Sequence, residues 1–310
     1  MEPISERRGY EAKKAARPLW RKLAGAALAT VLVLAVVGHN HGSGNDGDRV
    51  HYRRDVSRRA SAWQPKTGTT WQINIRDQLD LSNGNITPPV EVFDIDMFSN
   101  NAETVKTLHD AGKKVVCYFS AGSYENWRPD KDQFNQADLG NGLVGWPGEN
   151  WLNISSQNVR NIMAQRIKLA ADRGCDAIDP DNVDGYGNDN GLGLTADDSI
   201  SFVKFLAGEA AKYNMATGLK NAGDILPSVL DVVNFSVVES CVQFQECHIY
   251  SPIIQAGKPI FHIEYPDSAP NMDDAAVDNL CNSRGQDGCS TVMKLTNLNA
   301  WVEYCDKTKY

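Results

Sequence analysis

The stretch SSQNVRNIMAQRIKLAADRGCDAIDPD, residues 155–181, decides the fold class. Within it, residues 155–174 carry apolar side chains three and four positions apart, open with serine and close on glycine, which predicts a helix. The short apolar run 175–181 follows directly and predicts a buried strand that carries Asp179 and Asp181 at its end. A helix that leads straight into a buried strand is typical of parallel strands joined by right-handed crossovers.

The same alternation extends in both directions from this stretch. Predicted strands occupy residues 71–75, 91–98, 114–122, 175–181, 216–222, 232–239, 259–265 and 291–297. Predicted helices occupy residues 101–113, 155–174, 195–214, 224–232 and 273–285. Eight such strands predict an α/β protein with a (β/α)8 barrel of the TIM type. A doubly wound open sheet is the alternative, but no G-x-G-x-x-G follows the first strand.

Strand parity predicts which side chains point into the barrel. Alternation turns Phe93, Ile95 and Met97 outward toward the helices and Asp94 inward. The same parity predicts an inward or carboxyl-rim position for Asp96, Tyr118, Ser120, Asp179, Asp181, Lys220, Glu239, His262, Glu264 and Lys294. Barrel interiors are normally apolar and barrel enzymes react at the carboxyl ends of their strands, so this polar set predicts an active site there.

The N-terminal part predicts a membrane anchor ahead of the folded domain. Residues 1–22 are basic and residues 23–38 form an uncharged run, which predicts a cytoplasmic tail and a single transmembrane signal anchor of type II. A cleaved signal peptide is the alternative. Residues 39–68 are polar and predict a flexible stalk. The catalytic domain is expected at residues 69–310, outside the cell or in the secretory lumen.

Charge is distributed unevenly along the chain. The net charge is −8, but residues 1–59 hold twelve Lys and Arg against six Asp and Glu, which leaves 19 basic and 33 acidic residues afterwards, a net of −14. A domain this acidic argues against a nucleic-acid partner, because phosphates must be neutralised by Lys and Arg. It suits a cationic ligand, although negative charge that serves solubility alone is the simpler interpretation.

The seven cysteines fit an oxidising compartment in part. Disulfides Cys241–Cys247 and Cys281–Cys289 are expected as local loop closures, while Cys117 and Cys175 lie in apolar runs. The odd number leaves at least one thiol unpaired within the chain, and no cysteine spacing is typical of a zinc site. Asn85 and Asn153 are candidate glycosylation acceptors.

Four chemistries could use AIDPDNVDGY, residues 177–186, with its aspartates Asp179, Asp181 and Asp184. A calcium loop fails on spacing. The first motif of the haloacid-dehalogenase phosphatases belongs on a first strand, and three predicted strands precede this one. The D-x-D metal site of type II glycosyltransferases remains an alternative. The fourth is glycoside hydrolysis by paired carboxylates, with Asp181 at the end of the fourth strand and Glu239 at the end of the sixth.

The chain resembles a known family through an ordered set of short motifs. These are TWQINI, FDIDMF, VVCYFSAGSYENWRPD, WLNI, AIDPDNVDGY, GLKNA, VVE and FHIEY, spread over residues 69–300. They resemble the catalytic domain of glycoside hydrolase family 114, and within it the membrane-anchored fungal endo-α-1,4-galactosaminidases. The resemblance implies a (β/α)8 barrel that cleaves internal α-1,4 bonds in a galactosamine-containing polysaccharide of cell wall and biofilm matrix, with no cofactor and no metal. A monomer is expected.

The resemblance also implies roles for individual residues. Asp181 is expected to be the nucleophile of a retaining reaction and Glu239 the general acid/base, although the two roles could be reversed. Trp127, Trp146 and Trp151 lie in the long loop after the third strand, where exposed tryptophans stack on sugars or pack the loop. The expected substrate-binding residues are Asp94, Asp96, Tyr118, Ser120, Trp127, Asp179, Lys220, Glu264 and Tyr265. A glycan-binding barrel without catalysis is the remaining alternative.

Deacetylated galactosamine carries an ammonium group near neutral pH, so a polymer of such units is a polycation. The acidic domain would attract it, and we expect added salt to weaken hydrolysis of the deacetylated substrate.

Overall fold

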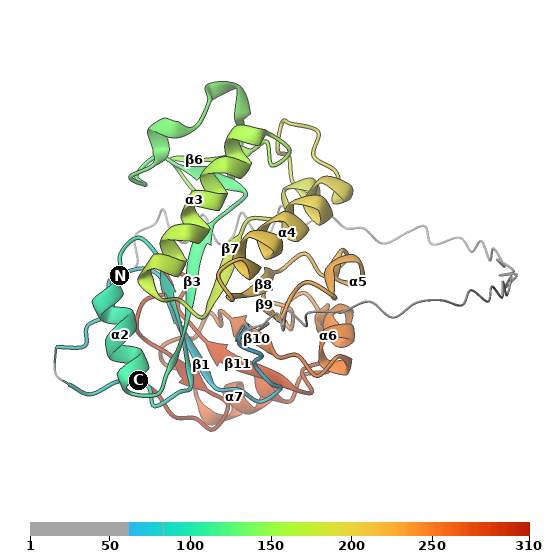
Figure 1. Ribbon diagram of the computed structural model, residues 1–310. Helices are drawn as coiled ribbons and strands as arrows, with labels where there is room; N and C mark the ends of the chain where they lie inside the picture. Colours follow the sequence, from blue (N-terminus) through green and yellow to red (C-terminus); the bar gives the residue numbers. More distant parts are fainter. Residues whose placement is uncertain (1–61, 83) are drawn as a thin grey trace, which may run out of the picture. The chain divides into compact units, whose positions relative to one another are not determined.

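A computed structural model describes residues 62–82 and 84–310 of the protein (Figure 1). Its main sheet has nine strands, which follow one another in chain order. They are β1 (Trp71–Asn74), β2 (Val92–Asp96), β3 (Lys114–Ser120), β7 (Ala177–Asp181), β8 (Ala216–Lys220), β9 (Phe235–Glu239), β10 (Ile260–Glu264), β11 (Cys289–Met293) and β12 (Glu303–Tyr304). The first eight are parallel and β12 pairs antiparallel with β11. All eight predicted strands are therefore confirmed.

The sheet curls until its first and last parallel strands lie beside each other. The indole nitrogen of Trp71 on β1 donates to the carbonyl oxygen of Ser290 on β11 at 2.7 Å, and Lys294 Nζ donates to Gln72 Oε1 at 3.0 Å. Eight parallel strands in sequential order, curled in this way, are consistent with the predicted (β/α)8 fold. Their carboxyl ends consequently meet at one rim.

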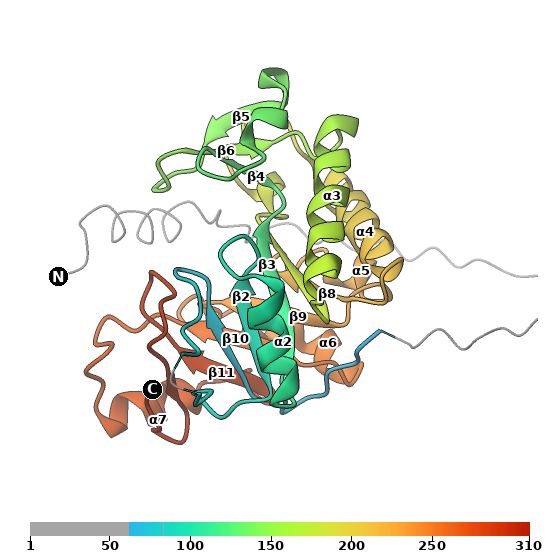
Figure 2. The same cartoon turned by 60° about the vertical axis from the view of Figure 1, so that its left-hand side comes forward.

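Helices cover the outer face of the sheet (Figures 1 and 2). They are α2 (Ala102–Asp110), α3 (Gln157–Arg173), α4 (Ala196–Ala211), α5 (Leu226–Val229), α6 (Ser251–Gln255) and α7 (Asp274–Cys281), with 3-10 turns η3 (Gly185–Gly187) and η4 (Cys247–Tyr250). Local sequence sets their ends: Thr195 and Asp198 form a capping box at the start of α4, and α3 ends at Gly174, whose φ of 90° suits glycine. The five predicted helices are confirmed, and the short α6 was not predicted.

Apolar side chains pack on both faces of the sheet. Outside, Phe93, Ile95 and Met97 belong to the large cluster that includes residues of the covering helices, as parity predicted. Inside, a second cluster contains Trp71 and Phe261, whose rings stack with centroids 4.9 Å apart. Burying a large apolar side chain contributes about 1.5–3 kcal/mol, so this cluster stabilises the fold as well as filling the barrel. The polar residues therefore lie above it, toward the carboxyl rim.

A second sheet lies between β3 and α3 and stands apart from the main sheet in both views (Figures 1 and 2). It consists of β4 (Ser123–Glu125), β5 (Leu139–Gly142) and β6 (Glu149–Leu152) in the order β4-β6-β5, with 3-10 turns η1 (Lys131–Gln133) and η2 (Gln136–Asp138). We call residues 121–156 the insert. The sequence predicted a loop here, because these strands are short, polar and rich in glycine, and give no alternating apolar pattern.

Three disulfides join the described cysteines. Cys241–Cys247 was predicted correctly, with Cα atoms 4.7 Å apart. The predicted Cys281–Cys289 bond is wrong: Cys281 pairs with Cys305, and Cys289 is a free thiol. The third bond links Cys117 on β3 to Cys175 just before β7. Spacing along the chain favoured the short loop, whereas pairing follows the folded path, which brings the end of α7 beside the residue after β12.

The N-terminal predictions lie mostly outside the described residues. This applies to the tail, to the predicted anchor at residues 23–38 and to most of the stalk. Among residues 62–82 and 84–310, no helix is long and apolar enough to cross a membrane. Residues ahead of the predicted domain start at Thr69 already pack against the barrel. The ring centroids of Trp63 and Phe235 lie 6.4 Å apart, and Gln64 accepts a hydrogen bond from Asn234.

Candidate active site

A cavity of about 400 Å³ opens at the carboxyl ends of the parallel strands. Two parts of the chain contribute most of its charged and aromatic side chains, and the segments that follow β1, β2 and β11 complete the lining. The strand ends contribute Asp96, Tyr118, Asp181, Lys220, Glu239 and Tyr265. The insert contributes Glu125, Trp127, Arg128, Trp146 and Glu149. The site thus combines the barrel rim, where the sequence placed it, with a wall that the sequence did not predict.

Asp181, Lys220 and Glu239 end three successive strands, β7, β8 and β9. Lys220 Nζ lies 3.1 Å from Asp181 Oδ1 and 3.4 Å from Glu239 Oε2. One ammonium group therefore contacts both carboxyl groups, and these two oxygens lie no farther apart than the sum of the distances, about 6.5 Å. The structure brings together the two residues that the sequence singled out as a carboxylate pair.

Both oxygens of Asp181 accept hydrogen bonds. The hydroxyl of Tyr118 donates to Oδ2 at 2.9 Å, and the backbone N–H of Asn182 donates to Oδ1 at 2.8 Å. Burial raises the pKa of Tyr118 well above its ordinary value, and the charge of Asp181 raises it further, so the hydroxyl keeps its proton. Hydrogen bonds of this kind favour the ionised form of a carboxyl group.

Glu239 is held by different partners. The hydroxyl of Tyr265 donates to Oε1 at 2.6 Å, and Asn221 Nδ2 donates to Oε2 at 3.0 Å. The side chain of Glu239 is 14% exposed, against 8% for Asp181. Glu239 is therefore the carboxyl group of the pair with better access to water and to a leaving group.

Lys220 keeps its charge although it is buried. Burial by itself would lower the pKa of Lys220, but the carboxylates of Asp181, Glu239 and Asp179 raise it above its ordinary value. The ring of Tyr118 also lies 5.7 Å from the ammonium nitrogen. A permanent positive charge thus lies between the two candidate catalytic groups.

The backbone turns sharply directly after each of these three residues. Asn182, Asn221 and Ser240 have φ values of 61°, 49° and 58°, in the left-handed region that non-glycine residues seldom adopt. Asparagine tolerates that region better than most residues. At Gly122, an added Cβ would lie 1.8 Å from the carbonyl oxygen of Asn182, so only glycine allows this close approach. Turns at the strand ends therefore fix where the functional side chains point.

Two predicted substrate-binding residues, Asp94 and Asp179, do not line the cavity. They are 1% and 0% exposed and lie one pleat below Asp96 and Asp181 on β2 and β7. Burial raises the pKa of Asp179 to about 7 and that of Asp94 well above its ordinary range. Parity gave their inward direction correctly, but residues nearer the rim enclose them.

Ser120 and Glu264 also lie away from the cavity lining. Ser120 Oγ is 2.6 Å from Ser123 Oγ and accepts from Asn182 Nδ2 at 2.9 Å, so it supports the lining from behind. Glu264 lies 2.8 Å from His262 Nε2 and accepts from the N–H of Val242, on the outer side of β10. The inward prediction for His262 and Glu264 is wrong because Phe261, Ile263 and Tyr265 take the inward positions.

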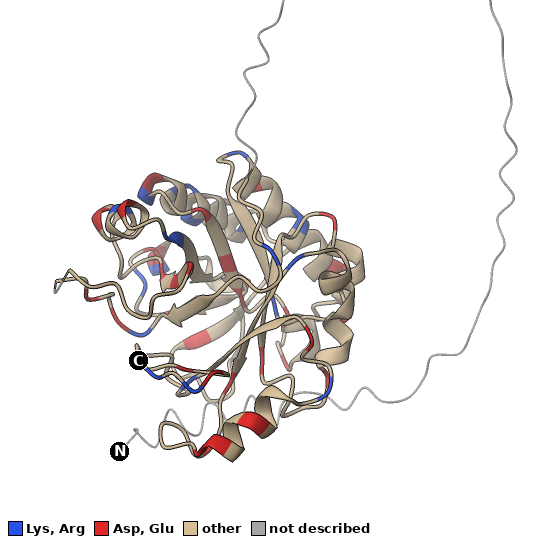
Figure 3. Ribbon diagram, turned by 90° about the horizontal axis from the view of Figure 1, so that it is seen from below, with Lys and Arg blue, Asp and Glu red and all other residues tan. Residues whose placement is uncertain are grey.

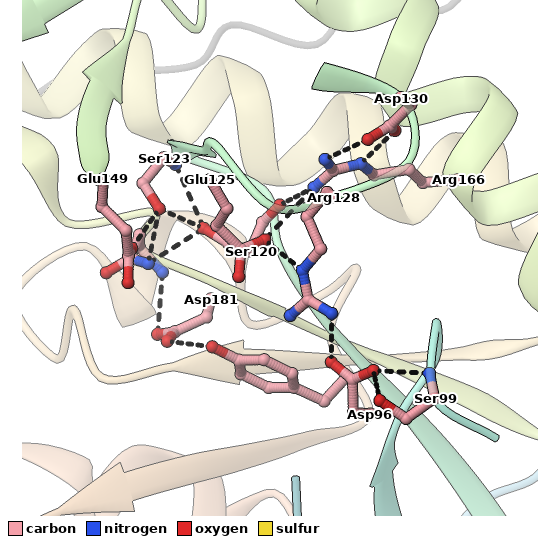
Figure 4. A network of polar contacts seen from close by, with 12 residues as sticks. Asp96, Ser99, Ser120, Ser123, Glu125, Arg128, Asp130, Glu149, Arg166 and Asp181 are labelled. Atoms are coloured by element: carbon pink, nitrogen blue, oxygen red, sulfur yellow. Dashed lines mark hydrogen bonds and ion pairs between the residues drawn. The ribbon is translucent and has the colours of Figure 1, made fainter. Parts of the chain in front are cut away.

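Buried arginines tie the insert to the barrel (Figure 4). Arg128 of the insert lies 2.7 Å from Asp96 at the end of β2 and 2.8 Å from Glu125. Arg166 of α3 binds Asp130 through two nitrogens, each at 2.8 Å, and donates to the carbonyl of Ser120 at 2.6 Å. Asp96 lines the cavity as predicted, but it is held in this network. The network fixes the insert against the rim.

The tryptophans of the insert divide into two groups. Trp127 and Trp146 line the cavity, and Trp127 is 53% exposed. Trp151 is 6% exposed and packs against Gly185, so it has a structural role. Glu149 lines the cavity beside them and accepts from Ser123 Oγ at 2.8 Å. The sequence pointed to both cavity tryptophans but not to Glu125, Arg128 and Glu149. The charged residues that flank the tryptophans were the available signal.

Among the described residues, one group could bring ligand atoms together around a metal ion. It consists of Cys241, Cys247 and His262, whose potential ligand atoms lie within 4.8 Å of one another. The two sulfur atoms form a disulfide, which removes them as ligands. In the D-x-D pair, Asp181 instead contacts the ammonium of Lys220. The cavity itself combines carboxyl groups, an ammonium group and aromatic rings.

Acidic positions occur on the strands of the sheet as well as on the helices (Figure 3). Five carboxyl groups line the cavity against three basic side chains, Arg76, Arg128 and Lys220. These five are Asp96, Glu125, Glu149, Asp181 and Glu239. The cavity therefore favours a cationic ligand.

Comparisons with known proteins show which family the chain resembles. The model of glycoside-hydrolase family GH114 matches residues 53–310. The crystal structure of Aspergillus fumigatus Ega3 in complex with galactosamine is 54% identical, covers 79% of this chain and 98% of that chain, and superposes with a TM-score of 0.75. No curated protein sequence matches the chain.

More distant structures share the fold alone. The glycoside hydrolase domain of PelA from Pseudomonas aeruginosa is 12% identical, covers 74% of this chain and 96% of that chain, and has a TM-score of 0.58. A variant of the same PelA domain is 11% identical over the same shares, with a TM-score of 0.55.

Proposed function

The chain belongs to glycoside hydrolase family 114, and from that premise we propose that it cleaves internal α-1,4 bonds between galactosamine units of a cationic polysaccharide. It is a glycosidase of that family. The observation that carries the proposal is the pair Asp181 and Glu239, which lines one cavity at the ends of β7 and β9 and shares the ammonium of Lys220.

The proposed reaction retains the anomeric configuration. Asp181 attacks the anomeric carbon and forms a glycosyl ester, while Glu239 gives its proton to the departing glycosidic oxygen. Glu239 then takes a proton from water, which attacks the ester and releases Asp181. Retaining enzymes hold their carboxyl groups about 5–5.5 Å apart, whereas inverting enzymes need about 6.5–9.5 Å. The shared contact with Lys220, which limits two oxygens to about 6.5 Å, favours the shorter arrangement.

The assignment of roles rests on the partners of each carboxyl group. Asp181 has the more enclosed side chain and accepts from Tyr118 and Asn182, which favours the ionised nucleophile. Glu239 is more exposed, as a group that exchanges protons with leaving group and water must be. No cofactor enters this scheme.

Galactosamine as substrate is supported by charge and by similarity. The ammonium group of each deacetylated unit is attracted by the excess of carboxyl groups in the cavity. The 54% identical relative was crystallised with galactosamine. Trp127, 53% exposed at the cavity, offers a flat apolar face on which a sugar ring can stack.

We also propose that the enzyme is a monomer anchored in the cell membrane by residues 23–38, with its catalytic domain outside. The uncharged run preceded by Lys and Arg supports this orientation. Three disulfides in the described part fit an oxidising compartment. Extraction of the full chain by detergent but not by high salt, together with protease access to the domain on intact cells, tests the proposal; release by salt alone contradicts it.

The decisive experiment incubates residues 53–310 with deacetylated and acetylated galactosaminoglycan and sizes the products. We expect intermediate oligomers from the deacetylated chain, as internal cleavage requires. Asp181→Asn and Glu239→Gln should each lower kcat by about 10³-fold or more. The control is Asp138→Asn, a buried carboxyl group of the insert outside the cavity lining.

Three outcomes would contradict the proposal. Wild-type rates in both catalytic variants would indicate a glycan-binding barrel. Activity that needs a sugar nucleotide and is lost in EDTA would indicate a glycosyltransferase. Release of single sugars from the first time point would exclude internal cleavage.

A further inference from the structure

Two carboxyl groups lie face to face beneath the cavity, and the proposed reaction does not use them. Asp94 comes from β2 and Asp179 from β7, the strands that flank β3, and both point inward. Side chains from alternate strands share a layer in a barrel of this type. Their carboxyl groups are hydrogen-bonded to each other.

A hydrogen bond between two carboxyl groups requires a proton on one of them. Among residues 62–82 and 84–310, no other N–H or O–H group donates to any of the four oxygens. If both groups were ionised, two negative charges would face each other in a buried site without any other hydrogen-bond donor. That arrangement is strongly unfavourable. Burial raises the pKa of both groups, and their mutual hydrogen bond raises that of Asp94 but lowers that of Asp179. One of the two carboxyl groups therefore holds a proton that the other accepts.

The pair acts electrostatically on the groups that line the cavity. Asp179 interacts with Lys220 on β8, with Asp181 two positions farther along β7, and with Glu239 on β9. Asp94 on β2 interacts with Lys220 and Asp181. Among these groups, Lys220 is the cation. The pair thus places negative charge under Lys220, on the side away from the cavity.

We propose that Asp94 and Asp179 share one proton, and that their single remaining negative charge is a positioning element which offsets the positive charge of Lys220 and so keeps the catalytic proton on Glu239. The proposal rests on the function assigned to Glu239 above. An ammonium group 3.4 Å from Glu239 favours the ionised carboxylate, which cannot act as an acid. The charge of the pair opposes this effect, so Glu239 remains protonated to a higher pH.

Two variants distinguish the effect of the shared proton from the effect of the negative charge on the pair. In Asp94→Asn, the amide donates to Asp179 in place of the shared proton, so the pair keeps one negative charge. In the double variant Asp94→Asn with Asp179→Asn, that charge is gone. Asp176→Asn is the control. Asp176 lies just before β7, at the end of that strand away from the cavity, and pairs with Lys114.

The first measurement is kcat/KM against pH, whose alkaline limb reports loss of the proton of the essential acid. Removing a negative charge stabilises ionised Glu239, so the limb of the double variant should move about one pH unit lower. The limbs of Asp94→Asn and Asp176→Asn should stay near that of the wild type. An equal shift in Asp94→Asn and in the double variant, or no shift in either, would overturn the proposal.

The second measurement detects the proton directly and does not depend on activity or on folding of the double variant. Infrared difference spectra at neutral pH should show the C=O stretch of a protonated carboxyl group that Asp94→Asn removes and Glu239→Gln retains. A spectrum unchanged by Asp94→Asn would overturn the proposal. If wild-type protein shows this band but hydrolyses no galactosaminoglycan, the proposed function fails and the shared proton stands.

Discussion

The ends of β7, β8 and β9 and the insert face each other across one cavity, and they are built differently. At the strand ends, charged side chains are nearly enclosed and bound to fixed partners: Asp181 to Tyr118, and both carboxyl groups to Lys220. On the insert, Trp127 is 53% exposed. The contrast indicates a division between a preorganised reacting centre and a wall that contacts the sugar chain.

The largest effect is expected at the strand ends. Lys220→Met removes the cation between Asp181 and Glu239, which leaves two carboxyl groups facing each other and favours protonation of the nucleophile. We expect kcat to fall by about 10³-fold, as for loss of a preorganised charge contact. Initial rates on deacetylated galactosaminoglycan measure the effect. Lys212→Met, at an exposed ion pair on the surface, is the control. A wild-type kcat in Lys220→Met would contradict a preorganised reacting centre at the strand ends.

The next effect tests whether the insert depends on the rim for its position. Arg128→Met leaves Asp96 and Glu125 without their shared cation in a buried site. Breaking a buried ion pair in this way costs about 3 kcal/mol of unfolding free energy. Denaturant unfolding measures it, with Lys106→Met as the exposed counterpart, whose pair with Asp110 contributes less than about 1 kcal/mol. Equal losses in both variants would contradict a network that fixes the insert.

A smaller effect is expected at the exposed face of the insert. Trp127→Ala should raise KM about tenfold with little change in kcat, because stacking on a bound sugar contributes about 1.4 kcal/mol. The unfolding free energy should change by less than about 0.5 kcal/mol, since the ring is half exposed. Tyr213→Ala alters an aromatic residue exposed elsewhere and should leave KM unchanged. A fall in kcat without a change in KM would place Trp127 in the reacting centre instead.

The smallest effect concerns the long-range charge of the cavity. Raising the salt concentration from about 0.1 M to about 1 M shortens the Debye length from about 10 Å to about 3 Å. We expect KM for the deacetylated polymer to rise about threefold, while contacts inside the closed centre, and hence kcat, change little. A partly acetylated polymer of lower charge is the comparison substrate. Equal salt dependence for both substrates would show that attraction of the ammonium groups is not responsible.

The two regions also differ in how far the sequence predicted them. Apolar runs alternating with helical patterns predicted every parallel strand, and parity placed Asp181, Lys220 and Glu239 at one rim. For the insert the sequence predicted only a loop, because the strands of its sheet are short and polar. Parity failed on β10, where apolar residues face inward, so the inward positions predicted for His262 and Glu264 are wrong.

The sequence by itself determined the order of the strands, the rim at which the carboxyl groups gather, and the family, because these follow from short-range periodicity and from motifs contiguous in the chain. The tertiary structure decided which residues meet: Cys281 with Cys305, Arg128 with Asp96, and Asp94 with Asp179 beneath the site. The physical reason is that contacts between distant segments depend on how strands curl and loops return. Depth below the surface also differs between carboxyl groups on the same strand. Asp181 lines the cavity, whereas Asp179 is enclosed beneath it and shares a proton with Asp94.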